Sequence, residues 1–156
     1  MLTIKDARIL AEQIKEKSPK VNSVELFGSV LRNGQGHDVD FILVVDDELS
    51  RQFWLDMPNF RVTGGRRWLM FRRVIKKLLP WLMEAFDHKS KQARQLRASR
   101  LVGINLAELS KQYKPDASID VLLMPHHWQS QIHKITSDRN IAMFFQRIAD
   151  SSVKLL

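Results

Sequence analysis

The chain has 156 residues, a formal net charge of +8 and no cysteine. This length suits one domain with a buried core, and the lack of cysteine excludes disulfides and thiolate metal sites and fits a reducing compartment. The longest apolar runs are too short to cross a bilayer, and the N-terminal segment lacks the apolar core of a signal peptide, so we expect a cytoplasmic protein with no membrane partner.

The first third of the chain alternates between helical and strand patterns. Apolar residues at helical spacing indicate helices, and strict alternation or a continuous apolar run indicates strands. The strand that ends in FILVV has a strongly apolar second half, which is typical of a central position in a sheet. In chain order we predict a helix over 3–17, a strand over 21–28, a helical turn over 29–36, a strand over 38–45 and a short helix over 47–58.

The rest of the chain is mostly helical by pattern. Residues 66–98 form an amphipathic pattern that Pro80 should kink or interrupt. In chain order we predict a turn over 62–67, helices over 66–98 and 99–113, a strand over 117–125, and closing helices over 127–135 and 138–156. The element order predicts a single α/β (α+β) domain over residues 1–156, with a small mixed β-sheet flanked by helices.

The positive charge is concentrated in residues 61–100, inside a basic helical segment at about 61–112. Residues 61–100 have a net charge of +10, because they contain twelve basic residues and only two acids, Glu84 and Asp87. The remainder of the chain has a net charge of −2. Such a helix face is either simply solvated or binds an anionic partner, with RNA such as tRNA ahead of lipid. A partner protein is a further alternative. The basic residues are Arg61, Arg66, Arg67, Arg72, Arg73, Lys76, Lys77, Lys89, Lys91, Arg94, Arg97 and Arg100.

Asp38 and Asp40 stand two residues apart in the predicted strand, so both side chains project from the same face. Asp120 is the one acid inside the other apolar strand, SIDVLL, and would join them if the two strands are neighbours. Paired carboxylates repel each other unless a cation lies between them, and Mg²⁺ prefers oxygen ligands. Alternatively, an Asp-x-Asp pair caps a turn or faces solvent.

The Gly28-Ser29 dipeptide ends the strand that precedes these acids. Gly28 permits an unusual backbone conformation, and Ser29 offers a hydroxyl and an N–H group at the start of a helical turn, where anions are favoured. Arg32, one turn further on, could add positive charge. The pattern indicates a phosphate-binding turn or an ordinary strand-to-helix turn.

Taken together, these motifs resemble the signature of the polymerase-β-type nucleotidyltransferase superfamily. That signature is a hydrophobic residue, Gly-Ser, a short spacer, Asp-x-Asp between apolar residues and a third acid on a later strand. FGSVLRNGQGHDVDFILV and IDVLL match it in order. The chain departs from it at His37, where the family often has Ser, and in the long interval between the second and third acids.

The resemblance implies a nucleotidyltransferase-like fold and a role for each motif. Asp38 and Asp40 would bind two Mg²⁺ ions, for which Mn²⁺ could substitute, and Asp120 would share the catalytic ion and help to activate the acceptor hydroxyl. Gly28 and Ser29 would hold the β- and γ-phosphates of a nucleoside triphosphate. Arg32 is a weaker candidate for the same role.

We therefore expect a metal-dependent nucleotidyltransferase. It would transfer a nucleoside monophosphate to an acceptor hydroxyl, at an RNA 3′ end or on a protein side chain, and release pyrophosphate. The alternative is a non-catalytic RNA- or protein-binding module on the same fold, such as an antitoxin-like partner. Against that alternative, three buried carboxylates without a metal ion would be costly.

Overall fold

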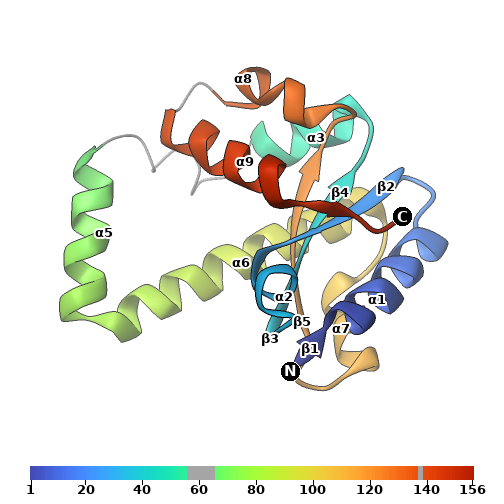
Figure 1. Cartoon of the computed structure of the whole chain (residues 1–156), viewed down its shortest axis with the longest axis horizontal. Coiled ribbons are helices and arrows are strands. Elements are labelled where there is room, and N and C mark those ends of the chain that lie inside the picture. The colour runs from blue at the N-terminus through green and yellow to red at the C-terminus, as the bar shows by residue number, and fades with distance from the viewer. Residues whose placement is uncertain (56–65, 137–138) are drawn as a thin grey trace.

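A computed structural model of the chain describes residues 1–55, 66–136 and 139–156 (Figure 1). A four-stranded sheet has the order β5-β4-β2-β6, with β4 and β5 parallel and the other pairs antiparallel. Two very short strands, β1 and β3, pair separately. The predicted small mixed sheet is confirmed. The strands are β1 (Leu2–Thr3), β2 (Ser23–Phe27), β3 (Gln35–Gly36), β4 (Asp38–Val44), β5 (Ser118–Met124) and β6 (Val153–Lys154).

Helices flank this sheet, as the α/β (α+β) prediction required. Thr3 begins the first helix with a capping box, and Pro80 stands at the first turn of the longest helix, so Pro80 separates two helices as predicted. The helices are α1 (Ile4–Lys17), α2 (Gly28–Asn33), α3 (Asp47–Leu55), α5 (Arg66–Leu78), α6 (Pro80–Val102), α7 (Leu106–Tyr113), the 3₁₀ turn η1 (Trp128–Ser130), α8 (Ile132–Ile135) and α9 (Arg139–Ser151).

The first face of the sheet packs against α1, α7 and the C-terminal end of α6. Its core contains alternate residues of the two parallel strands together with apolar residues from those helices. The alternation follows from strand geometry, in which successive side chains point to opposite faces. The strand residues buried in this core are Val39, Phe41, Leu43, Ile119, Val121 and Leu123.

The second face packs against η1, α8 and α9, and it is the face that carries the acids. Ile42 and Val44 of β4 lie in this smaller core with Trp128 and Phe145. Asp38 and Asp40 have the same parity along β4 as these apolar residues, so they project from the same face at the start of the strand. One strand face is therefore apolar at its C-terminal half and acidic at its N-terminal end.

Helix α5 and the first part of α6 project away from the sheet (Figure 1). The sequence predicted a broad apolar face on residues 66–98, and most of its described members are exposed rather than covered; Trp81 is 65% accessible. None of the described helices is long and apolar enough to span a membrane. The exposed apolar residues of this arm are Met70, Val74, Leu78, Leu79 and Trp81.

Two predicted helices are wrong in part. The predicted helix over 99–113 is divided at Gly103, whose left-handed backbone (φ 76°) ends α6, and Asn105 caps the start of α7. The predicted helix over 138–156 ends at Ser151, and Val153–Lys154 instead pair with β2. The helical pattern of the sequence carries no information about the free edge of β2, whose backbone N–H and C=O groups require partners.

Smaller differences concern the connecting segments. Of the predicted turn over 62–67, residues 62–65 lie outside the described residues, and the helix predicted over 47–58 is described only as far as Leu55. The predicted helix over 127–135 is a 3₁₀ turn followed by the one-turn helix α8. None of these differences affects the position of the acids.

Candidate active site

Asp40 and Asp120 lie directly opposite each other on the parallel strands β4 and β5. Asp38 is opposite Ser118, two pairs further toward the start of both strands. The strand of Asp120 is therefore the neighbour of the strand that carries the Asp-x-Asp pair, as the sequence analysis required. Because paired residues of adjacent strands project from the same face, all three carboxyl groups belong to one end of one sheet face.

Gly28 is fixed beside Asp40 for steric reasons. Its backbone is left-handed (φ +79°), and a Cβ atom at this position would overlap the Asp40 carboxylate. The unusual backbone predicted for Gly28 is confirmed, and it serves here to bring the chain close to an acid. The backbone N–H of Ser29 donates to the Asp40 carboxylate. The Gly-Ser turn and the second acid thus form one unit.

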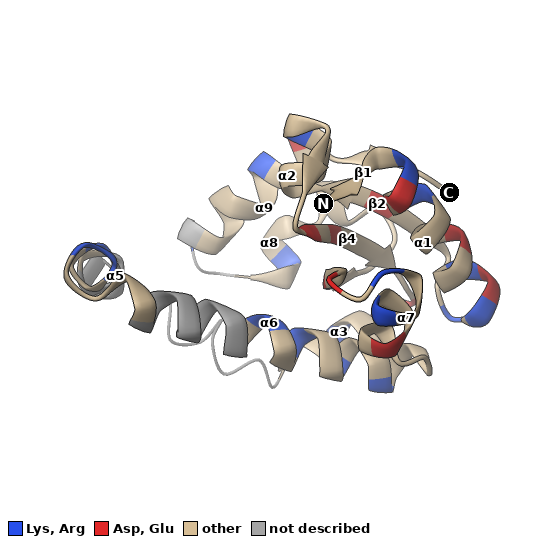
Figure 2. Ribbon diagram, turned by 90° about the horizontal axis from the view of Figure 1, so that it is seen from below, with Lys and Arg blue, Asp and Glu red and all other residues tan. Residues whose placement is uncertain are grey.

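Two basic side chains of α6 pair with the other two acids. Figure 2 shows basic residues of α6 in blue and acids of β4 in red on the ribbon. Lys91 Nζ lies 2.5 Å from Asp38 Oδ1. Arg94 binds Asp120 through two parallel contacts, Nη2 to Oδ2 at 2.5 Å and Nε to Oδ1 at 3.0 Å. This bidentate arrangement is the strongest geometry for a guanidinium and a carboxylate. Two of the three acids therefore have a counter-ion supplied by the protein.

Asp40 has the least favourable surroundings of the three. Burial, and after it the negative charges of Asp120 and Asp38, raise its pKa to about 6. Lys91 and the Ser29 N–H oppose this effect only in part. A carboxyl group with a strongly raised pKa, placed among other charged groups, is a common mark of a functional site.

The donor set suits a hard divalent cation in kind. Three carboxylates offer only oxygen ligands, which is the chemistry that Mg²⁺ selects. However, among residues 1–55, 66–136 and 139–156, no group of three or more His, Cys, Asp or Glu side chains is arranged to hold a metal ion. Both oxygens of Asp120 are held by Arg94. An ion would have to displace the two basic side chains.

The other predicted site residue, Arg32, is exposed in the last turn of α2. No hydrogen bond or ion pair joins it to the acids among the described interactions, and its proposed phosphate contact stays a prediction. Sequence reasoning missed the positions of Lys91 and Arg94. Their spacing of three residues within the basic segment was a usable signal, because residues three apart share one side of a helix.

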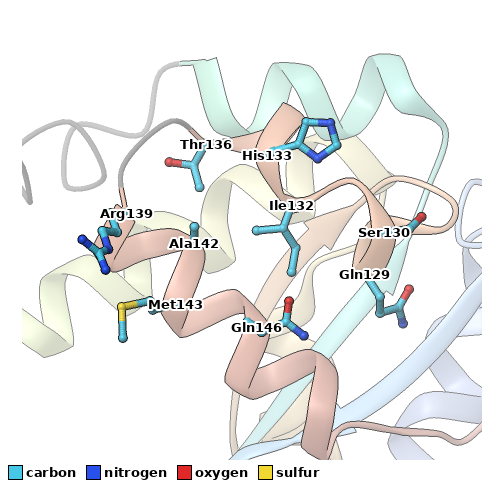
Figure 3. A pocket seen from close by; sticks show the side chains of 9 residues that line it. All are labelled: Gln129, Ser130, Ile132, His133, Thr136, Arg139, Ala142, Met143 and Gln146. Atoms are coloured by element: carbon cyan, nitrogen blue, oxygen red, sulfur yellow. The ribbon is translucent and has the colours of Figure 1, made fainter.

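A separate open pocket of about 590 Å³ lies between α8 and α9 (Figure 3). Its lining combines neutral polar and apolar side chains with Arg139 and His133. None of the three aspartates lines it. The acidic end of the sheet and this pocket are therefore distinct places on the molecule.

Comparison with known families agrees with this geometry. The family model described as "Nucleotidyltransferase domain" matches residues 7–142, a range that begins in α1, ends in α9 and includes all three aspartates. The chain belongs to this nucleotidyltransferase domain family. Its general role is thus nucleotidyl transfer, with a nucleoside triphosphate as the substrate class. The comparisons with curated proteins and with solved structures found no match.

Proposed function

We propose that this protein transfers a nucleoside monophosphate from a nucleoside triphosphate to an acceptor hydroxyl and releases pyrophosphate. The observation that carries the proposal is the pairing of Asp40 with Asp120, next to Asp38 and against the Gly28-Ser29 turn. In a member of the nucleotidyltransferase domain family, this is the set of groups that the reaction requires.

Each residue has a role that its position supports. Asp38 and Asp40 would bind two divalent ions, Mg²⁺ or Mn²⁺, and Asp120 would share the ion nearest the acceptor. Such ions neutralise phosphate charge and favour in-line displacement. Gly28 and Ser29 would contact the β- and γ-phosphates, with Arg32 as an additional cation. Asp120 would also help to orient and activate the acceptor hydroxyl. Catalysis of this kind depends on positioning and charge neutralisation.

The acceptor we favour is an RNA 3′ end or a protein side chain. Support comes from the arm formed by α5 and the start of α6, where Arg73, Lys76 and Lys77 are exposed and no acid occurs in α5. Such a surface can neutralise RNA phosphates or contact an acidic partner protein through residues 61–100. Binding of RNA, including tRNA, would then weaken steeply as salt concentration rises.

The test is pyrophosphate release. The protein is incubated with each nucleoside triphosphate, Mg²⁺ and in turn RNA, candidate proteins and small hydroxyl compounds. We expect one combination to release pyrophosphate and label the acceptor, and Asp38→Asn to lower the rate at least about 1,000-fold, since loss of a metal ligand removes several kcal/mol of charge stabilisation. An Asp38→Asn protein with the wild-type rate would refute the proposal.

A second function is favoured by one specific observation. Lys91 and Arg94 already neutralise Asp38 and Asp120, which weakens the argument that only a metal ion could stabilise these acids. A non-catalytic RNA- or protein-binding module could therefore keep the same acids. It would bind RNA in EDTA, and Asp40→Asn would bind as tightly as the wild type. A requirement for Mg²⁺ in nucleotide binding would favour the enzyme.

A further inference from the structure

We propose that Lys91 and Arg94 are the residues that bind the triphosphate of the nucleotide, exchanging their carboxylate partners for phosphate oxygens when the nucleotide and its metal ions bind. This inference rests on the proposed function, because it concerns the same site. It assigns to α6, an element outside the recognised sequence motifs, a direct part in substrate binding.

The first support is the position of the two side chains. Lys91 and Arg94 are three residues apart on α6, and both reach acids of the sheet rather than solvent. Their side chains are only 15% and 18% exposed, which is unusual for long basic residues. Arg94 Nη1 also donates to Ser90 Oγ at 3.0 Å, which orients its guanidinium. The two cations are thus held in the site before any substrate enters.

The second support is that the backbone beneath these side chains is anchored. Gln95 Nε2 donates to the carbonyl oxygen of Ile119 on β5 at 3.0 Å. The guanidinium of Arg97 donates to the carbonyl oxygen of Gln52 in α3. Ala98 and Val102 are buried in the first core. Side chains on such a fixed helix can change partners without moving the helix, and rigid elements position ligands well.

The third support is the charge of the site. When Asp38 and Asp120 bind metal ions, Lys91 and Arg94 lose their carboxylate partners. The ions also add positive charge beside these two side chains. An unpaired, largely buried cation is costly, so another anion must replace the carboxylates. The triphosphate is that anion, because it enters with the metal ions and carries several negative charges. A planar guanidinium suits it especially, since it binds phosphate through two parallel hydrogen bonds.

Binding of inorganic tripolyphosphate tests the inference directly, because this probe has the phosphates of the substrate without a base. Its affinity is measured by calorimetry with Mg²⁺ for the wild type, Lys91→Gln, Arg94→Gln and the control Arg100→Gln. We expect both site variants to bind at least about tenfold more weakly. Arg100 is exposed on the same helix, six residues beyond Arg94, and Arg100→Gln should bind within twofold of the wild type.

The outcome that would overturn the inference is also clear. Lys91→Gln and Arg94→Gln that bind tripolyphosphate as tightly as the wild type, or more tightly, would show that these residues serve only as counter-ions of the acids. Failure of the wild type to bind tripolyphosphate would overturn it as well. Thermal unfolding of each variant, without ligand, shows whether a weak binder is folded.

A double variant separates phosphate binding from pairing with the acid. In Asp120→Asn, Arg94 has lost its carboxylate partner. If Arg94 served only as the counter-ion of Asp120, adding Arg94→Gln in this background would leave tripolyphosphate binding unchanged. We expect instead that Asp120→Asn binds tripolyphosphate without Mg²⁺ more tightly than the wild type, and that adding Arg94→Gln removes this gain. A double variant equal to Asp120→Asn would overturn the inference. These binding readouts do not depend on catalysis.

The inference and the proposed function can fail independently. Weak tripolyphosphate binding in Lys91→Gln and Arg94→Gln, with no pyrophosphate release by the wild type from any substrate pair, would leave the inference standing and refute the enzyme. Pyrophosphate release with a wild-type KM for the nucleotide in both variants would refute the inference and leave the enzyme standing.

Discussion

Asp6 and Asp40 are two carboxylates that the fold treats in opposite ways. Asp6, in the first turn of α1, accepts hydrogen bonds from the Thr3 backbone and hydroxyl, from the Tyr113 hydroxyl at 2.6 Å and from Lys114 Nζ at 3.0 Å. The Tyr113 hydrogen bond is the largest of the effects that hold the pKa of Asp6 well below its usual range. Asp40, by contrast, has a pKa raised to about 6 by burial and by neighbouring acids.

The difference shows which acid serves stability and which does not. Around Asp6 the chain supplies donors from three residues in two separate segments, so ionisation of this group strengthens the fold. Around Asp40 it supplies one backbone donor and places two further acids nearby. A fold able to satisfy one carboxylate so completely has no structural need for the Asp40 arrangement. Sites that cost stability are expected where function requires them.

The largest expected effect is on activity. Asp40→Asn should lower pyrophosphate release at least about 1,000-fold, because an amide is a poor ligand for a hard cation. Asp6→Ala, assayed well below its melting temperature, should stay within about threefold of the wild type, since Asp6 supports the fold and not the site. An Asp6 variant that is folded and inactive would break the comparison.

The next effect is the loss of stability in Asp6→Ala. The change removes the Asp6 half of the capping box and the acceptor for Tyr113 and Lys114, and we expect it to lower the free energy of unfolding by about 4 kcal/mol at pH 7. Because the folded pKa of Asp6 is lowered, its contribution is present above pH 4 and declines as the pH falls further. Urea unfolding at pH 7 and pH 3 measures the difference, which should be smaller at pH 3.

Much of the fold could be predicted from the sequence because it depends on local pattern. The alternation in VNSVELFG and the apolar runs DVDFILVV and SIDVLLM correspond to β2, β4 and β5, and Pro80 separates α5 from α6 as expected. The C-terminal strand β6 was not predictable in this way. Its two residues are set by the edge of β2, which is distant in sequence.

In the candidate site, too, the residues specified by local sequence pattern could be predicted, and those that depend on tertiary packing could not. Asp38, Asp40 and Asp120 were predicted as site residues because strand periodicity and motif order specify them, and β4 and β5 do lie side by side. Lys91 and Arg94 belonged to a segment interpreted as an RNA-binding or solvated face. Their contacts depend on how α6 packs along β5, which is a tertiary property that helical periodicity does not contain.

A smaller effect, of opposite sign, is expected for the stability of Asp40→Asn in metal-free protein. The folded pKa of about 6 exceeds the ordinary value of 3.8, so folding favours the protonated form. Stability is therefore lost as the pH rises through this range, and the ionised group costs about 2–3 kcal/mol at pH 8. Asp40→Asn should recover this amount at pH 8 and little at pH 4, by urea unfolding in EDTA. An Asp40→Asn protein less stable than the wild type at pH 8 would contradict this prediction.

The smallest expected effect tests how much of the stabilisation by Asp6 comes from its hydrogen bond with Tyr113. Tyr113→Phe removes one donor and keeps the ring, while the Thr3 and Lys114 contacts to Asp6 persist. We expect a loss of about 1–2 kcal/mol at pH 7, typical of one hydrogen bond to a charged group. In the Asp6→Ala background the same substitution should cost much less, because the two residues act as one unit. Equal costs in both backgrounds would mean that Tyr113 stabilises the fold by packing alone, and that Asp6 owes its low pKa to its other donors.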